Sequence, residues 1–348
     1  MQRAYPPHLT KLDRDLADCA ARGDLAAVSA LLAEGANPML RDSEALVQAS
    51  LHGHSKCVEL LAPLSDPLAR NSRALFSAVE GGHASCARIL LPLSDAKADG
   101  SRSLLKAISL GDAEIFDLLL PASDAKARSG APLGLATILG RARFVKILAQ
   151  ISEPGLISNA LCVAAQKGHA DCVKILMAAL GPRDKSSRAL CWAAANGHAE
   201  CVKLLLPFCD PKSRNSEALR LAAGNAKPNC VELLLSESDA PSSGALFAAA
   251  AKGCLESVRI LLPRSKPLAD DPAPLSHAIA KGFVEIFVSM LSHEPGLTAT
   301  LDFSAIASSS TQGGFHELAA LALALREQRE LSSGPFAAGR PRQNPSRL

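Results

Sequence analysis

The sequence predicts an all-α fold, a solenoid of helix-turn-helix repeats joined by short connectors. One segment recurs almost verbatim, for example at residues 45–63 (ALVQASLHGHSKCVELLAP) and 189–207 (ALCWAAANGHAECVKLLLP). Hydrophobic residues make up 48% of the chain but aromatic residues only 3%, so the core must consist of Ala, Leu, Val and Cys, which suits closely packed helices. One helix pair cannot bury its own apolar face, and stacking such pairs makes a continuous core.

A central glycine anchors each repeat. It recurs every 27 to 30 residues, at Gly23, Gly53, Gly82, Gly111, Gly140, Gly168, Gly197, Gly253 and Gly282, and Ala226 takes its place between Gly197 and Gly253. A period this regular indicates a repeat array. We expect ten units, and an eleventh, eroded unit around Gly313 or Gly314.

Each part of the unit has a local physical reason. A Ser ten residues before the anchor predicts the N-cap of a short, Ala-rich first helix; it is present as Ser43, Ser72, Ser101, Ser158, Ser187, Ser216 and Ser243. The anchor can take a positive φ and end that helix. A second helix with apolar residues at helical spacing follows. A proline often closes it, because proline has no amide to continue the helix; these are Pro63, Pro92, Pro121, Pro207 and Pro263.

The unit resembles the ankyrin repeat over about residues 11–325. The resemblance depends on the Pro-Leu pairs 132–133 and 274–275, the Gly-His turns 53–54, 82–83, 168–169 and 197–198, and the segment EGANP at 34–38. The period is about 29 residues instead of 33, and the shortfall lies in the connector. The resemblance therefore implies an ankyrin-type solenoid with short connectors and reduced hairpin fingers, most similar to arrays of bacterial ankyrin proteins.

The predicted organisation has three parts. Residues 1–10 form an N-terminal tail. Residues 11–331 form the array of ten or eleven repeats, with an atypical capping unit at 298–331 that shields the end of the core. Residues 332–348, rich in Pro and Arg, form a disordered basic tail.

Three columns of residues resemble sites but follow the period of the repeat. Cys57, Cys86, Cys172, Cys201 and Cys230 each lie four residues after an anchor and are interpreted as small buried hydrophobes. His54, His83, His169 and His198 are interpreted as turn residues bonded to nearby backbone. Asp66, Asp95, Asp124, Asp210 and Asp239 are interpreted as side chains that shape their own turns. A metal ion needs several ligand atoms around one point, whereas each column supplies one side chain per repeat. We therefore expect no metal site.

Several function classes receive no support from the sequence. A net charge of +3 without a concentrated basic face, and few aromatic residues, argue against nucleic acid as a partner. No segment approaches 18 uninterrupted apolar residues, which argues against a membrane span. Motifs of hydrolases, metalloproteases, kinases and P-loop enzymes are missing, so we predict neither enzymatic activity nor a cofactor.

The resemblance implies a binding surface, because the two positions before the glycine lie on the concave face of ankyrin arrays and often contact the partner. With Trp192, the one Trp of the chain, added as a possible anchor, the predicted partner-binding residues are Leu51, His52, Glu80, Leu110, Ile138, Leu139, Gln166, Lys167, Trp192, Asn196, Asn225, Lys252 and Lys281. Leu110, Ile138 and Leu139 form either an exposed apolar patch or part of the core of a misaligned repeat. The later lysines suggest an acidic partner segment.

We therefore predict a non-catalytic, monomeric protein-interaction scaffold or effector that binds another protein. One alternative is an inhibitor or immunity-type protein that captures and blocks an enzyme. A second is an enzyme with a site in the groove. Ten cysteines without a disulfide pattern suggest a reducing compartment and a cytoplasmic location, with export into a host cell by a non-standard signal as the alternative.

Overall fold

A computed structural model describes residues 10–181, 187–268 and 273–333. The described part consists of helices and connectors and contains no β-strand. These residues fall into two compact units. Residues up to 164 together with 171–181 form the first unit, and residues 165–170 together with those from 187 onward form the second. The predicted 1–10 tail and 332–348 tail lie almost entirely outside the described residues.

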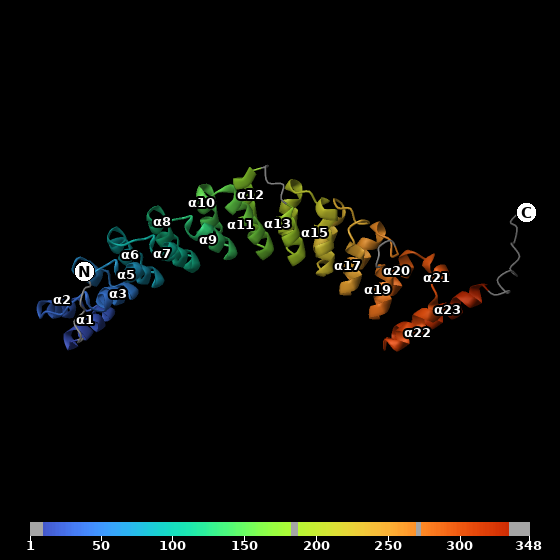
Figure 1. The fold of residues 1–348 in the computed structure, drawn as a ribbon, viewed down its shortest axis with the longest axis horizontal. Coiled ribbons are helices and arrows are strands. Elements are labelled where there is room, and N and C mark those ends of the chain that lie inside the picture. The colour runs from blue at the N-terminus through green and yellow to red at the C-terminus, as the bar shows by residue number, and fades with distance from the viewer. Residues whose placement is uncertain (1–9, 182–186, 269–272, 334–348) are drawn as a thin grey trace, which may run out of the picture. The chain divides into compact units, whose positions relative to one another are not determined.

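The first unit is built from helix pairs that stack in sequence (Figure 1). Its helices are α1 (Lys11–Arg22), α2 (Leu25–Ala33), α3 (Leu40–Leu51), α4 (Ser55–Leu61), α5 (Ala69–Glu80), α6 (Ala84–Leu90), α7 (Ala98–Leu110), α8 (Ala113–Leu119), α9 (Ala127–Ile138) and α10 (Ala142–Ile151). The first helices α1, α3, α5, α7 and α9 pack on one another in one row, and α2, α4, α6 and α8 in another. The units divide within the next pair, α11 (Pro154–Lys167) and α12 (Ala170–Leu180).

The second unit repeats this arrangement. Its helices are α13 (Arg188–Asn196), α14 (Ala199–Leu205), α15 (Ser213–Gly224), α16 (Pro228–Leu235), α17 (Ala245–Lys252), α18 (Leu255–Leu261), α19 (Pro274–Lys281), α20 (Val284–His293), α21 (Leu297–Thr300), α22 (Phe303–Gln312) and α23 (His316–Ser333). The first-helix row is α13, α15, α17, α19 and α22. The second row is α14, α16, α18 and α20. The pair α22–α23 occupies the segment predicted as the capping unit, and Gly314 is its turn glycine, with φ 78°.

The prolines predicted to close the second helices do so by changing the helix type. Each lies in the middle of a short 3₁₀ turn that continues the α-helix: η1 (Ala62–Leu64), η2 (Leu91–Leu93), η3 (Leu120–Ala122), η5 (Leu206–Phe208) and η6 (Leu262–Arg264). Because proline lacks the amide that the next α-helical bond needs, the chain turns out of the helix there. The connector to the next first helix is therefore short, as predicted.

The core between the two helix rows consists of small and aliphatic side chains. In α13 and α14, Leu190, Ala193, Ala194, Val202 and Leu205 are at most 1% exposed. Each fully buried Leu or Val stabilises the fold by about 1.5–3 kcal/mol, but only when a neighbouring repeat covers it. Since the helices need close approach for this burial, the scarcity of aromatic residues follows from the architecture.

Candidate functional site

The turn that joins the two helices of a pair fixes the position of the candidate surface. At every predicted anchor glycine φ is positive, between 65° and 83°. Ala226 adopts the same conformation with φ 54°, although a Cβ makes it unfavourable. The predicted left-handed turn is thus present in every repeat, including the one that lacks glycine.

At several anchors, a side chain from the next repeat packs directly on the turn glycine. A Cβ on Gly23 would lie 2.3 Å from Nδ1 of His54, and one on Gly168 would lie 2.5 Å from Nδ1 of His198. Nε2 of His54 is 2.9 Å from the carbonyl oxygen of Ala21, and Nε2 of His198 is 2.9 Å from that of Gln166. These two histidines of the four do bind backbone, as predicted, but the backbone belongs to the preceding repeat. They therefore hold neighbouring turns together.

The serine column has a different role from the predicted N-cap. In α5, residues Arg70, Asn71 and Ser72 form a left-handed turn with φ 47°, 58° and 59° before the regular helix begins. Ser72 Oγ accepts a 2.8 Å hydrogen bond from the backbone N–H of Asp95 in the next connector. The same bond joins Ser43 to Asp66, Ser101 to Asp124 and Ser216 to Asp239, each at 2.8 Å. The N-cap prediction is wrong at these four positions, because the left-handed turn directs the hydroxyl toward the following repeat.

The aspartate and cysteine columns have the predicted structural roles. The Oδ1 atoms of Asp66, Asp95, Asp124 and Asp210 accept from the amide two residues ahead, at 2.9–3.1 Å. The five column cysteines are at most 1% exposed and unbridged. Burial raises the pKa of the Cys86 thiol to about 11, and it also raises the pKa of the Cys57, Cys172 and Cys230 thiols. Over the described ranges, no group of His, Cys, Asp and Glu could hold a metal ion.

In the first unit, the predicted binding residues lie at the C-terminal ends of the first helices. Leu110 at the end of α7 is 45% exposed, and Ile138 and Leu139 at the end of α9 are 47% and 41% exposed. These three residues are therefore surface residues and not part of a misaligned core. His52 is exposed too, whereas Leu51 and Glu80 are half-buried, and Glu80 pairs with Lys106 at 3.1 Å.

In the second unit, the corresponding positions are polar or cationic. Gln166, Lys167, Asn196, Asn225, Lys252 and Lys281 are all exposed. Trp192 is 41% exposed, one turn before the end of α13. The Nδ2 of Asn196 donates to the Trp192 carbonyl oxygen at 2.8 Å, which ties this end of the helix together.

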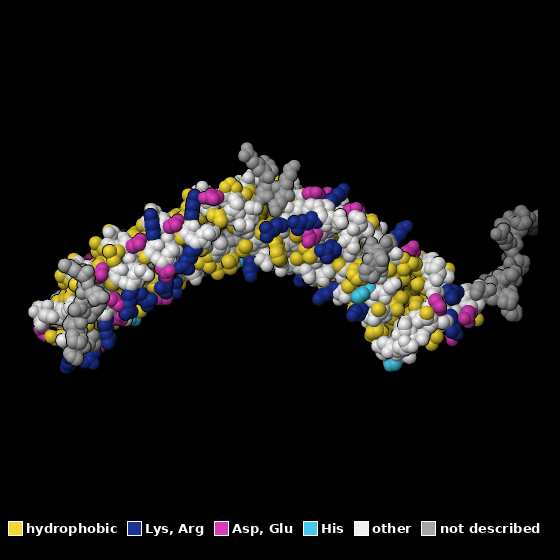
Figure 2. All heavy atoms as spheres, viewed as in Figure 1, with side chains coloured by type: hydrophobic (Ala, Val, Ile, Leu, Met, Phe, Trp, Pro, Cys, Tyr) yellow, Lys and Arg dark blue, Asp and Glu magenta, His cyan; other side chains and the backbone are white. Residues whose placement is uncertain are grey.

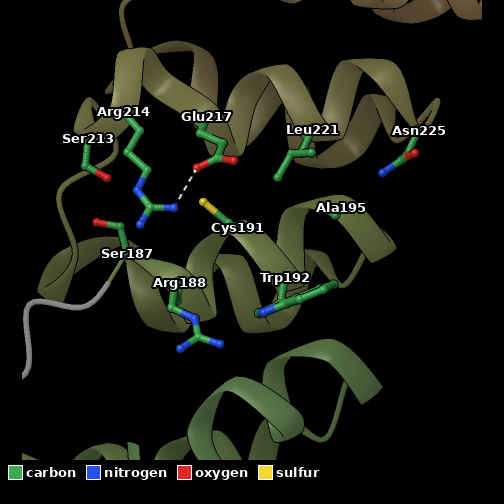
Figure 3. Close-up of a pocket in the computed structure, with 10 residues that line it drawn as sticks. All are labelled: Ser187, Arg188, Cys191, Trp192, Ala195, Ser213, Arg214, Glu217, Leu221 and Asn225. Carbon is green, nitrogen blue, oxygen red and sulfur yellow. Dashed lines mark hydrogen bonds and ion pairs between the residues drawn. The ribbon is translucent and has the colours of Figure 1, made fainter. Parts of the chain in front are cut away.

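A pocket of about 680 Å³ lies between α13 and α15 in the second unit. It brings together Trp192 and Asn225 from the predicted set with Ser187, Arg188, Cys191, Ala195, Ser213, Arg214, Glu217 and Leu221 (Figure 3). Leu221 points from α15 toward α13, and Arg188 and Trp192 lie on one side of α13. Glu217 is held by Arg214 at 3.4 Å and Arg220 at 3.8 Å.

The sequence prediction missed most of this pocket lining. Arg188 and Glu217 lie nine residues before their anchors, and Leu221 lies five residues before Ala226. These positions belong to the same helix face as the predicted ones, because residues three and four apart on a helix are neighbours. They lie four or eight residues, about one or two helical turns, before the predicted positions Asn196 and Asn225.

Comparison with known proteins agrees with the repeat. A family model described as "Ankyrin repeats (3 copies)" matches residues 16–99, 133–215, 161–244 and 190–271, which is more than half of the chain. A search of curated proteins found no match. Among solved structures, the chain is similar to the human ASB11 ankyrin repeat domain, with 22% identity, a TM-score of 0.43, and coverage of 60% of this chain and 96% of that one.

Ankyrin repeats are generally protein–protein interaction modules, and their fold is typically non-catalytic. In the part of the chain that the structure describes, no helix has both the length and the apolar character of a membrane span. The family match, the helix pairs and the glycine turn of each repeat lead to one conclusion. The chain belongs to the ankyrin repeat family.

Proposed function

We propose that this protein is a non-catalytic interaction module, a scaffold or effector that holds a partner protein on the ends of its first helices. The observation that carries the proposal is the exposed apolar group formed by Leu110, Ile138 and Leu139, here called the apolar trio. Its three members are 41–47% exposed and lie on α7 and α9, which pack on each other. Large apolar side chains clustered on a surface often mark an interface.

The apolar trio would contribute to binding mainly through loss of contact with water. Covering apolar surface yields about 25 cal/mol per Å², and the same three side chains contribute little to the fold because nearly half of each is exposed. Figure 2 shows hydrophobic side chains exposed between charged ones on the visible face of the molecule. The Arg141 guanidinium lies against Gly111, next to Leu110 of the apolar trio. An apolar patch with a charged neighbour suits a protein surface with an apolar centre and a polar rim.

The residues that line the pocket between α13 and α15 support the proposal that the protein is not an enzyme. Glu217, the carboxylate of this pocket, is engaged by two arginines. Cys191, Ser187 and Ser213 line the same pocket, and the described lining residues include no histidine. Among these described residues there is thus no Ser–His or Cys–His pair of the kind on which acyl transfer depends.

The test is capture with matched variants. The full chain, the variant Leu110→Asp with Leu139→Asp, and the control Leu64→Asp with Leu93→Asp are used to capture partners from the source cell's lysate. Leu64 and Leu93 are 47% and 46% exposed but lie in the 3₁₀ turns after second helices, at the opposite end of the helix pairs. The proposal expects all three proteins to have the same helical content, and only the trio variant to lose its partner.

Two outcomes would contradict the proposal. One is capture of the same partners by the trio variant. The other is equal loss in the control, which would show that any added charge is enough. A single stoichiometric enzyme that is blocked on capture would favour the inhibitor alternative, and turnover of a substrate that is lost on mutation of the pocket would favour the enzyme.

A further inference from the structure

The pocket between α13 and α15 combines an apolar interior with an excess of positive charge. Leu221, Ala195 and Cys191 are half-buried and line the space between the helices, and the Trp192 indole lines the pocket from the same side of α13 as Arg188 (Figure 3). Arg188 lies one helical turn before Trp192. This pocket is in the second unit, whereas the apolar trio is in the first.

The charges of the second unit are sorted between its two helix rows. The first helices α13, α15, α17 and α19 carry Arg188, Arg214, Arg220, Lys252 and Lys281 against one acidic residue, Glu217. The second helices α14, α16, α18 and α20 carry Glu200, Glu232, Glu256 and Glu285 against Lys203 and Arg259. The row that contains the pocket therefore attracts an anionic partner, and the other row does not.

Within this row, the arginines differ in their availability. Arg214 and Arg220 share the carboxylate of Glu217, at 3.4 Å and 3.8 Å. Arg188 is exposed, and among the described residues no ion pair involves it. A guanidinium binds a carboxylate through two parallel N–H donors, which gives both strength and direction.

From this geometry, and resting on the proposed function as a protein-binding module, we propose that the pocket takes an extended acidic peptide segment of the partner. A carboxylate of the peptide pairs with Arg188, and an aliphatic or aromatic side chain two residues away fills the space between Trp192 and Leu221. The spacing follows from the helix: Arg188 and Trp192 are four residues apart, which separates their Cβ atoms by about 5–6 Å. Alternate residues of an extended peptide point to one side and are about 6.5 Å apart.

The far end of the pocket fits a peptide backbone. Asn225 is exposed at the end of α15 and lines the pocket. Its amide carries both donors and an acceptor, so it can bind the N–H and C=O groups that an extended peptide leaves unpaired on its edge. Further along the row, Lys252 and Lys281 would meet additional acidic residues of the same segment.

The experiment is selection of a random seven-residue peptide library displayed on phage against the full chain. The inference expects enrichment of Asp or Glu two positions from Leu, Ile, Met or Phe. The most enriched peptide is then synthesised, and its binding is followed by the fluorescence of Trp192, the one Trp of the chain. Replacing the acidic residue of the peptide by its amide, or Arg188→Gln in the protein, should weaken binding about tenfold, the effect of a charge-assisted hydrogen bond.

Matched variants separate this role from a general effect of charge. Lys203→Gln removes one exposed positive charge from α14 and should leave the affinity unchanged. When the amide-substituted peptide is measured with Arg188→Gln, the two losses of affinity should not add, because both changes remove the same interaction. Trp192→Phe should keep part of the affinity measured by calorimetry, and Trp192→Ala should lose most of it.

The inference is overturned if no peptide is enriched, if enriched peptides lack an acidic residue, or if Arg188→Gln binds them as tightly as the unaltered chain. Enrichment of purely apolar peptides would leave the chain a binding module and remove only the acidic specificity. Loss of a captured partner on changing the apolar trio, with peptide binding intact, would show two separate sites. Peptide selection therefore tests the acidic-peptide site, whereas capture with the apolar-trio variant tests the proposed function, and each can fail without the other.

Discussion

The hydroxyl of Ser72 in α5 and the backbone N–H of Asp95 in the next connector form a 2.8 Å hydrogen bond across two repeats. Ser72 is 2% exposed, so the bond is shielded from water on the serine side. The same pair recurs in both units, and its members are 23 positions apart in the sequence each time. It joins one repeat to the next in addition to the packing of their helices.

Removing this bond should destabilise the array. We expect Ser72→Ala to lower the free energy of unfolding by about 1–2 kcal/mol, because the Asp95 amide loses its partner in a partly buried place. Urea unfolding monitored by circular dichroism measures it. The control is Ser77→Ala on the same helix: Ser77 is fully buried and its Oγ has no hydrogen-bond partner, so its removal should be neutral or stabilising. Equal losses in both variants would contradict the bond's role.

Relieving the strained turn should stabilise the second unit. Ala226 holds φ 54° in the place of an anchor glycine. A left-handed backbone conformation destabilises a non-glycine residue by about 1–2 kcal/mol. Replacing Ala by Gly removes this strain, but it also raises the entropy of the unfolded chain, which offsets part of the gain in stability. We expect Ala226→Gly to raise the free energy of unfolding by about 0.5–1 kcal/mol. Thermal unfolding checks the sign, and a lower melting temperature for the variant would refute the expectation.

Two glycines with the same backbone angle separate strain from contact. Gly23 and Gly82 both have φ 74°, but a Cβ on Gly23 would lie 2.3 Å from the His54 ring, whereas a Cβ on Gly82 would meet nothing within 4 Å. Gly82→Ala should therefore cost only the backbone strain, about 1 kcal/mol. Gly23→Ala should cost at least about 1 kcal/mol more, because His54 must leave the Ala21 carbonyl. Paired urea titrations measure the difference, and equal costs would show that the His54 contact contributes nothing.

Thiol chemistry should reveal the buried cysteine column. Since burial raises the pKa of Cys86 to about 11, its thiolate is scarce at pH 8, and the thiolate is the reactive form. Iodoacetamide at pH 8 should label the partly exposed Cys191, Cys209 and Cys254 within minutes and spare Cys57, Cys86, Cys172, Cys201 and Cys230 until unfolding. Mass spectrometry of the peptides gives the order of labelling. Early labelling of Cys86 in the folded chain would contradict its burial.

The same raised pKa predicts a loss of stability at high pH. The folded state holds the Cys86 proton more tightly than the unfolded chain, whose thiol has an ordinary pKa near 9. The stabilisation that the folded state gains from this protonated thiol is complete below about pH 9, and it is lost as the pH rises from about 9 to 11. Unfolding free energy should fall more steeply over this window in the unaltered chain than in Cys86→Ala. Parallel slopes for the two proteins would show that Cys86 does not titrate differently on folding.

The repeat, its period and the buried face of each helix could all be predicted from the sequence. These follow from local patterns: the glycine every 27–30 residues, the apolar spacing within each helix, and the prolines after the second helix. The sequence also predicted the ends of the first helices as a surface, and the exposure of Leu110, Ile138 and Leu139 agrees with that prediction.

The contacts between neighbouring repeats became visible only in the folded structure. Ser72 looked like an N-cap because a serine before a helix usually caps it, yet its hydroxyl accepts from Asp95, 23 residues away. The pocket between α13 and α15 likewise depends on two helices whose lining residues are separated by a whole repeat. A pattern within one repeat determines its helices, because those bonds are local. Contacts between repeats depend on the direction in which each side chain leaves the left-handed turn. That direction is known only once the repeats are packed against one another.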